Sequence, residues 1–302
     1  MHVRSTHFDM NGLIFDIKEF SIRDGEGVRT TVFFKGCPLR CAWCHNPEGL
    51  SPTPELWADP ARCRNCGLCR IPCEHTDCKP FGRCLHVCPQ DLVRCVGKTY
   101  TVPELAARLR RQKPMFDAMG GGVTLSGGEP LLQADFCAEL LKELGGDIHT
   151  TVETSGYASE RDFERIIHLC DFVIMDIKLM NDEAHRHWTG VSNAQILSNA
   201  KLLMRSGVPH LFRTPLIPSI TDTEENLRAI AEFLGDEPIE FLPYNDLAPA
   251  KYAAVGRTFS SEIDPNKKRT PDLSFFKNAT LRIYRKGTHR GECLFGCLII
   301  IS

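Results

Sequence analysis

Residues 36–47 read GCPLRCAWCHNP, and this stretch decides how the rest of the chain is interpreted. It holds Cys37, Cys41 and Cys44 in a C-x3-C-x2-C spacing, with Trp43 directly before the last cysteine. Each iron of a cubane iron–sulfur cluster takes one cysteine, so three thiolates leave one iron open to a ligand that is not protein. Because catalytic metal sites keep an open position and structural sites do not, the spacing predicts a place where a cofactor or substrate binds a redox metal directly.

The same cysteines allow two simpler interpretations. Zinc could be bound with the adjacent His45 as the fourth ligand, or the thiols could be buried without any metal. The spacing argues against zinc, because zinc knuckles favour C-x2-C pairs. The open iron–sulfur cluster is therefore the preferred interpretation.

Length and composition exclude several classes of protein. The 302 residues suit one large domain, with or without an insertion, and the 42% hydrophobic and 25% charged residues are typical of globular proteins. The net charge of −2 provides no basic field for nucleic acid, and no apolar run is long enough to span a bilayer. The start, MHVRSTHFDMNG, lacks a secretory signal, and translation could begin at Met1 or Met10. We expect a cytoplasmic monomer that binds neither nucleic acid nor membranes.

Fifteen cysteines are unusual for a chain without an export signal, and eleven of them lie between Cys37 and Cys95. Cytosolic thiols stay reduced, so this clustering indicates metal binding rather than a disulfide framework. Because low-potential iron–sulfur clusters react with oxygen, we expect an anaerobic or microaerobic cytoplasm.

The remaining four cysteines lie outside this cluster. Cys137 and Cys170 fall in apolar stretches that we predict to be helical, where they would be inert core thiols. Cys293 and Cys297 form a C-x3-C near the end of the chain, which we interpret as an ordinary tail rather than a metal pair.

A second cysteine-rich segment resembles the ferredoxin pattern. CRNCGLCRIPC has the C-x2-C-x2-C-x3-C spacing in which the fourth cysteine ligates the other of two clusters. CKPFGRCLHVCP follows as a second run, with Phe81 where a cysteine is expected. In this pattern each cysteine run gives its last cysteine to the other cluster, which predicts two sets of four ligands. The later Cys95 completes the second set. The first set is Cys63, Cys66, Cys69 and Cys88, and the second set is Cys73, Cys78, Cys84 and Cys95.

Other metal arrangements remain open for this segment. Both sites could hold zinc, and the second could be a three-iron cluster or one ligated by His75 or His86. The segment has few large apolar residues, so metal must hold it together. We predict a ferredoxin-like domain at 51–98, inserted into a domain formed by 12–50 and 99–302.

The rest of the chain alternates between strand and helix patterns. This order predicts a parallel sheet covered by helices, with functional loops at the carboxyl ends of the strands. We predict strands at 13–17, 30–35, 122–125, 148–153, 172–176, 208–214, 239–242 and 280–284, and helices at 102–112, 131–144, 161–169, 194–204 and 224–234, the last one capped by Thr223.

Polar motifs follow several of these strands. SGGEP, at 126–130, places a glycine pair where backbone groups could approach a ligand ammonium, and the preceding glycines at 120–122 are interpreted as a flexible connection. Glu153, Asp176 and Lys178 stand at the ends of apolar strands, where they could be either functional or merely solvent-facing.

Arg213, in HLFRTPLIP, offers a planar guanidinium suited to a carboxylate. It also lies in a predicted strand, so a solvent-facing position is the simpler alternative.

Six motifs in order carry a resemblance to a known family: GCPLRCAWCHNPEG, GGGVTLSGGEPLLQ, TVETSGY, DIK, RTPLIP and LPYNDLAPAKY. From Gly12 to about Lys286 the chain resembles the radical SAM enzymes that activate glycyl radical enzymes, and the insert is similar to that of their larger members. The resemblance implies an α/β fold, a partial (β/α)6 TIM-like radical SAM barrel with an inserted ferredoxin-like iron–sulfur domain. It implies that S-adenosylmethionine chelates the open iron, that one electron cleaves its S–C5′ bond, and that the 5′-deoxyadenosyl radical takes a glycine Cα hydrogen from a partner enzyme.

The resemblance also implies roles for single residues. The three cysteines of the first motif would bind the catalytic cluster, with Trp43 beside the cofactor. Residues implied to bind the amino group, carboxylate or ribose of S-adenosylmethionine are Gly127, Gly128, Glu129, Lys178 and Arg213. Those implied to hold a monovalent cation nearby are Glu153, Thr154 and Asp176.

Two positions depart from the family pattern. Asp24, in DGEGVRT, matches an acidic residue near the glycine of the partner, but Glu26 replaces the usual proline. Asn245 follows LPY where many relatives have histidine, and this position contacts adenine in the family. The adenine contact is therefore expected to differ in this chain.

The resemblance implies further cofactors and partners. We expect three [4Fe–4S] clusters, one catalytic and two auxiliary, although one auxiliary cluster could have three irons. A glycyl radical enzyme would be the protein substrate, and reduced ferredoxin or flavodoxin would supply electrons. The alternatives are a radical SAM enzyme acting on a small molecule, an iron–sulfur electron-transfer protein and a zinc-based interaction protein.

Overall fold

The computed structural model describes residues 10–245, 248–260 and 262–281. Cys293, Cys297 and the last three residues of the strand predicted at 280–284 lie outside these ranges. The strands are β1 Asn11–Ser21, β2 Arg29–Phe34, β3 Glu55–Ala58, β4 Val93–Val96, β5 Lys98–Thr101, β6 Gly122–Gly127, β7 Thr150–Thr154, β8 Phe172–Asp176, β9 His210–Leu216, β10 Ile239–Pro243 and β11 Ala279–Leu281. The α-helices are α1 Val102–Arg110, α2 Lys113–Met119, α3 Ala134–Leu144, α4 Glu160–Ile167, α5 Asp182–Thr189, α6 Ala194–Ser206, α7 Glu224–Leu234 and α8 Pro249–Ala254.

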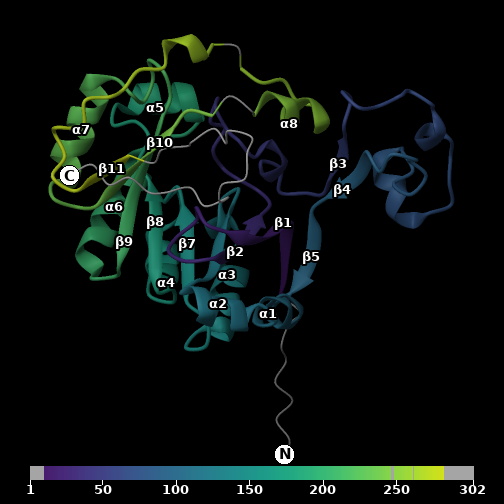
Figure 1. Cartoon of the computed structure of the whole chain (residues 1–302), viewed down its shortest axis with the longest axis horizontal. Coiled ribbons are helices and arrows are strands. Elements are labelled where there is room, and N and C mark those ends of the chain that lie inside the picture. Colours follow the sequence, from purple (N-terminus) through teal and green to yellow (C-terminus); the bar gives the residue numbers. More distant parts are fainter. Residues whose placement is uncertain (1–9, 246–247, 261, 282–302) are drawn as a thin grey trace, which may run out of the picture.

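One nine-stranded sheet organises the α/β fold, in the order β11-β10-β9-β8-β7-β6-β2-β1-β5 (Figure 1). The strands from β2 to β11 in this order run parallel, whereas β1 pairs antiparallel with both β2 and β5. The predicted parallel sheet with a βα repeat is therefore confirmed. Parallel pairing brings the carboxyl ends of β2, β6, β7, β8 and β9 to one edge, which is where the sequence places its polar motifs.

Local signals set the ends of several helices. Thr101 and Glu104 form a capping box at the start of α1, and the predicted cap Thr223 accepts a hydrogen bond from the backbone N–H of Asn226 at the start of α7. The helix predicted at 131–144 begins later, because Pro130–Gln133 forms a 3-10 turn before α3. The short helices α2, α5 and α8 were not predicted from the sequence.

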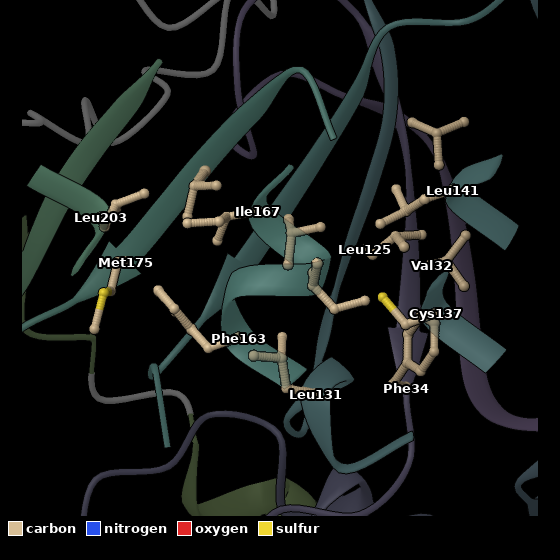
Figure 2. Packing of buried hydrophobic residues seen from close by; sticks show 14 of the residues in the cluster. Val32, Phe34, Leu125, Leu131, Cys137, Leu141, Phe163, Ile167, Met175 and Leu203 are labelled. Atoms are coloured by element: carbon tan, nitrogen blue, oxygen red, sulfur yellow. The ribbon is translucent and has the colours of Figure 1, made fainter. Parts of the chain in front are cut away.

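The core lies between the parallel sheet and its layer of helices. Figure 2 shows side chains from β2, β6 and β8 packed against those of α3, α4 and α6. Cys137 is fully buried in this layer, as predicted, whereas Cys170 lies in the bend after α4 rather than in a helix. None of the described helices is both long and apolar enough to cross a bilayer.

The glycines at 120–122 do not form a flexible connection, which corrects the interpretation above. A Cβ atom on Gly121 would lie 1.7 Å from the carbonyl oxygen of Val28, and one on Gly122 would lie 2.0 Å from that of His149. Only glycine permits such close backbone approach, so these residues let β6 begin between two neighbouring chain segments.

The predicted insert departs from the barrel in its construction. Its β3 and β4 form a separate two-stranded sheet, while β5 already belongs to the main sheet. It projects from one side of the barrel, next to α8 (Figure 1). Neither of the two hydrophobic clusters of the described residues includes a side chain from 51–98. This agrees with the expectation that apolar packing alone does not hold the segment.

Candidate active site

The loop that carries the three cysteines follows β2 and is anchored on both sides. Its backbone N–H groups at Arg40 and Ala42 donate to the carbonyls of Thr189 (2.7 Å) and Trp188 (3.0 Å) at the end of α5. Trp43 is 5% exposed and packs into a second hydrophobic cluster. These contacts fix the loop over the carboxyl edge of the sheet.

Buried charges support the far end of this loop. Lys35 Nζ, at the end of β2, donates to the Glu48 carbonyl (2.7 Å) and to Glu55 Oε2 (2.6 Å). Lys251 Nζ of α8 contacts Glu48 Oε1 at 2.8 Å, and Arg257 pairs with Glu55 at 2.6 Å. No sequence signal indicated this network, because its paired members are separated by up to 203 residues.

The environment of the loop favours neutral thiols in the absence of metal. Burial raises the pKa of Cys37 and of Cys41 to about 12, and that of Cys44 to about 11. Thiolates in this setting need a compensating positive centre, and metal ligation provides one because ligating cysteines are deprotonated. The three thiols are therefore protonated in the free protein, and binding of a metal must release their protons.

The glycine pair of SGGEP lets the loop after β6 pass directly under the cysteine loop. A Cβ atom on Gly128 would lie 2.2 Å from the carbonyl oxygen of Gly36, and one on Gly127 would lie 2.5 Å from the backbone nitrogen of Phe34. Gly127 also has a φ of +114°, which side chains rarely allow. The pair thus serves close backbone packing, whatever ligand its backbone approaches.

Glu129 links two of the functional loops. Its Oε1 accepts from Thr154 Oγ1 at 2.6 Å, and its Oε2 accepts from the backbone N–H (2.8 Å) and Oγ (2.5 Å) of Ser155. The side chain is fully buried and does not line the cavity described below. Burial raises the pKa of Glu129, while these hydrogen bonds act in the opposite direction. Its carboxylate is therefore a positioning group for the loop after β7.

Arg213 is also buried beneath the cavity. Its Nη1 contacts Glu153 Oε1 at 2.5 Å and its Nε contacts Glu240 Oε2 at 3.0 Å, while Nη2 is buried without a hydrogen-bond partner among the described residues. The other oxygen of Glu153 accepts from Ser126 Oγ at 2.6 Å. A monovalent cation at Glu153 would therefore compete with Arg213 for the same carboxylate.

Two more charged groups face the cavity. Lys178 Nζ donates to Asp176 Oδ2 at 2.7 Å. Burial lowers the pKa of Lys178, but Asp176 and the nearby Cys41 outweigh it and raise this pKa above its ordinary value. Asp24 Oδ2 accepts from Ser21 Oγ and Thr31 Oγ1, both at 2.6 Å, so its carboxylate is held in place.

A cavity of about 310 Å³ lies between these groups. Twelve predicted site residues line it: Asp24, Cys37, Cys41, Trp43, Cys44, Gly127, Gly128, Glu153, Thr154, Asp176, Lys178 and Asn245. Lining residues that were not predicted from the sequence include Ser126 and Ser155, which adjoin recognised motifs. Others are Pro215, Ile217, Leu242 and Tyr244, which lie in the last residues of β9 and β10 or directly after these strands. Their position at strand ends was the available signal.

The first cysteine set of the insert also surrounds one cavity. Cys63, Cys66, Cys69 and Cys88 all line a space of about 850 Å³, and residues 253–256, at the end of α8 and directly after it, line the same space. The four cysteines of the predicted first set therefore line a single space in the structure.

The second set has the arrangement of the alternative with His75, and not that of the set completed by Cys95. Cys73, Cys78 and Cys84 come together with His75, and the four ligand atoms lie within 4.8 Å of one another. Cys95 is not a member of this group; it lies on β4, and its Sγ contacts the Gly97 carbonyl at 3.7 Å.

Comparisons with known proteins agree with this site. The model of the Radical SAM superfamily matches residues 31–234. The isethionate sulfite-lyase activating enzyme of Oleidesulfovibrio alaskensis is 40% identical, over 82% of this chain and 87% of the relative. The (2S)-3-sulfopropanediol dehydratase activating enzyme of Klebsiella oxytoca is 35% identical, over 81% and 86%. The trans-4-hydroxy-L-proline dehydratase activating enzyme of Clostridioides difficile is 35% identical, over 84% and 91%.

These relatives share one kind of activity in their names, activation of another enzyme, while differing in the enzyme that is activated. They favour the activating enzyme over the small-molecule radical enzyme and the electron carrier as interpretations. Since the superfamily match covers more than half of the chain and these relatives are aligned over most of their length, the chain belongs to the glycyl-radical-enzyme activating enzymes of the radical SAM superfamily.

Proposed function

We propose that this enzyme installs a glycyl radical on a partner enzyme, using a cluster at Cys37, Cys41 and Cys44 and S-adenosylmethionine in the adjacent cavity. The observation that carries the proposal is the convergence of three partly buried thiols with polar groups from four strand ends around one space of about 310 Å³. A three-cysteine set leaves an open iron for the cofactor.

The residues around the cavity fit such a cofactor. Three thiols on one wall can bind the cluster, and the Lys178 ammonium provides a cation for a carboxylate. The orphaned Nη2 of Arg213 leaves one more buried donor close to this charge network. When bound, the cluster and S-adenosylmethionine supply one-electron chemistry that generates a hydrogen-abstracting radical. The chain itself orients the cofactor and keeps water away from it.

Asp24 is proposed to face the partner's glycine loop. It lines the cavity from the segment before β2, and two hydroxyl groups hold its carboxylate. This segment is tied down by two further hydrogen bonds, because Arg29 Nη1 donates to the Glu26 carbonyl (3.2 Å) and Thr124 Oγ1 of β6 donates to the Asp24 carbonyl (2.6 Å). A loop fixed in this way can present a carboxylate to an entering peptide without first becoming ordered.

The insert is proposed to pass electrons to the barrel through a cluster on the first cysteine set. Its cavity touches the end of α8, and Lys251 of α8 contacts Glu48 in the cysteine loop. Arg64, Arg70 and Arg83 line the same cavity. This basic rim suits an acidic electron donor such as reduced ferredoxin or flavodoxin.

The direct test uses anaerobically reconstituted protein with S-adenosylmethionine and dithionite. We expect 5′-deoxyadenosine to form and, after addition of purified isethionate sulfite-lyase, sulfopropanediol dehydratase or hydroxyproline dehydratase, a glycyl radical signal in the electron paramagnetic resonance spectrum of at least one. Nucleoside without any radical on these three proteins would direct the search to another glycyl radical enzyme. Absence of nucleoside from iron-loaded protein would contradict the proposed chemistry.

The relay is tested separately by Cys66→Ala. This variant should keep cofactor cleavage with dithionite, which reaches the catalytic cluster directly, but should activate the partner at least about tenfold more slowly with reduced flavodoxin. Cys95→Ala, outside both ligand groups of the structure, is the matched control and should behave as the wild type. Normal activation by Cys66→Ala would show that the insert is not an obligatory relay.

A further inference from the structure

We propose that the second cysteine set of the insert is a mononuclear zinc site with Cys73, His75, Cys78 and Cys84 as its ligands. The ferredoxin-like spacing predicted a cubane cluster here, and the arrangement of the side chains does not fit one. This inference goes beyond the activation chemistry, because zinc is not redox-active and lies away from the cavity that binds the cofactor.

The spacing of the ligand atoms matches a single tetrahedral ion. All four ligand atoms lie within 4.8 Å of one another, and Cys84 Sγ is 3.7 Å from His75 Nδ1. A zinc–sulfur distance of about 2.3 Å places two sulfurs of a tetrahedron roughly 3.8 Å apart, and a nitrogen at about 2.1 Å gives a sulfur–nitrogen edge of roughly 3.6 Å. In a cubane each cysteine binds a different iron, so its sulfurs are spread over the corners of a larger body.

The first cysteine set provides an internal comparison. Its four cysteines surround a cavity of about 850 Å³, and they do not form a group of mutually close ligand atoms among the described residues. The same insert thus contains one open cage with four thiols and one closed group with three thiols and an imidazole. An open cage can receive a cluster, whereas a closed Cys3His group is a usual structural zinc site.

The local backbone explains how the closed group forms. The 3-10 helix Thr76–Phe81 begins directly after His75 and carries Cys78, and Gly82 then reverses the chain with a φ of +60°. The reversed segment brings Cys84 back beside Cys78, where the Leu85 N–H donates to Cys78 Sγ at 3.2 Å. Such N–H to sulfur bonds stabilise ligating thiolates.

Phe81 and the burial of the thiols agree with this assignment. Phe81 replaces the cysteine that a second cubane would need. Cys78 and Cys84 are only 3% and 1% exposed, in a segment without a hydrophobic cluster of its own. Two buried thiols and a histidine in a core-poor segment are typical of structural zinc, which contributes folding energy directly.

A neighbouring pair supports the histidine ligand. The His75 ring lies against that of His86, with centroids 4.6 Å apart, and His86 Nε2 contacts Asp77 Oδ2 at 2.8 Å. This contact orients the ring of His86 beside the site, and so restricts the position of the His75 imidazole. Zinc at this site would leave the first cysteine set as the redox centre of the insert.

The test is a metal analysis of the full-length protein purified without oxygen and reconstituted with iron and sulfide. We expect about one zinc and about eight irons per chain, the sum of one zinc site and two cubanes. Zinc X-ray absorption should give three sulfurs at about 2.3 Å and one nitrogen at about 2.0–2.1 Å. Neither measurement depends on turnover, so a failure here is distinct from a failure of the proposed activity.

Matched variants identify the ligands. His75→Ala should lower the zinc content from about one per chain to nearly none and leave the iron content unchanged. Cys95→Ala should change neither metal, whereas the three-cubane alternative predicts that it loses iron. If His75→Ala does not fold, His75→Cys tests the same ligand. This variant should retain zinc, and its X-ray absorption spectrum should show four sulfur ligands.

Three outcomes would overturn the assignment. About twelve irons without zinc would indicate a third cubane, and about nine irons without zinc would indicate a single iron in place of zinc. Retention of zinc with an unchanged ligand spectrum in His75→Ala would exclude this histidine as a ligand.

Discussion

The barrel and the insert of this enzyme are held together by different means. The barrel contains a large hydrophobic cluster that draws side chains from most of its strands and helices. The insert, at 51–98, contributes no side chain to either hydrophobic cluster, and ten residues of its sequence between Cys63 and Cys95 are potential ligands: eight cysteines, His75 and His86. Apolar packing therefore shapes one region, and metal ligation shapes the other.

The difference extends to how each region holds its functional groups. Around the cofactor cavity, hydrogen bonds between loops from different strands position the side chains, as Glu129 does for Thr154 and Ser155. In the insert, the cysteine and histidine side chains that can ligate metal would also hold the segment together. The barrel site is therefore expected to remain shaped without its cofactor, whereas the insert is not.

The largest expected effect distinguishes a cysteine proposed to ligate the catalytic cluster from a cysteine of the barrel core. Cys41→Ala should abolish cleavage of S-adenosylmethionine, because it removes one of three ligands of the catalytic cluster. Formation of 5′-deoxyadenosine by the reconstituted variant measures this. Cys137→Ala, which removes a fully buried core thiol in α3, is the control and should retain cleavage. Cleavage by Cys41→Ala would refute the assignment of the site.

Removal of all metals should unfold the insert and leave the barrel folded. We expect hydrogen exchange of the backbone in 51–98 to accelerate by about a thousandfold or more in the apoprotein, because metal binding and folding are coupled there. The parallel strands β6 to β9 should retain their protection. Exchange measured by mass spectrometry on apoprotein and reconstituted protein decides this. An insert that remains protected without metal would show that packing suffices.

A core substitution in the barrel should destabilise the protein more than a matched one in the insert. Leu140→Ala, at a fully buried position of α3, should lower the free energy of unfolding by about 2–5 kcal/mol. Leu68→Ala, at a position that is 43% exposed in the insert, should change it by less than about 0.5 kcal/mol. Denaturant unfolding of both variants tests the contrast, and equal losses would contradict it.

The smallest expected effect concerns the link between the loops. Glu129→Gln places an amide NH2 against donors of Thr154 or Ser155, which leaves a buried donor unpaired at a cost of about 1–3 kcal/mol. We expect affinity for S-adenosylmethionine to fall about tenfold while the cluster is retained, as measured by calorimetry and iron content. Glu139→Gln, on the exposed face of α3, is the matched control. Unchanged affinity in Glu129→Gln would exclude a positioning role.

The local order of this protein was predictable from its sequence. The strand and helix patterns, the Thr223 cap and the position of polar motifs after strands all follow from residues that are close together in the chain. The parallel pairing then follows from the βα alternation, and twelve of the site residues that the motifs and the family resemblance indicated line one cavity.

Only the tertiary structure determined which segments that are distant in the sequence contact one another. It directs Glu129 to the loop after β7, places Arg213 beneath the cavity, and requires glycine at positions 121 and 122 because other backbone segments pass beside them. It also brings His75, rather than Cys95, to three cysteines. Spacing along a chain reports which side chains share an element, but the contacts between elements depend on the sheet order and on the turns of the backbone, which only the folded chain determines.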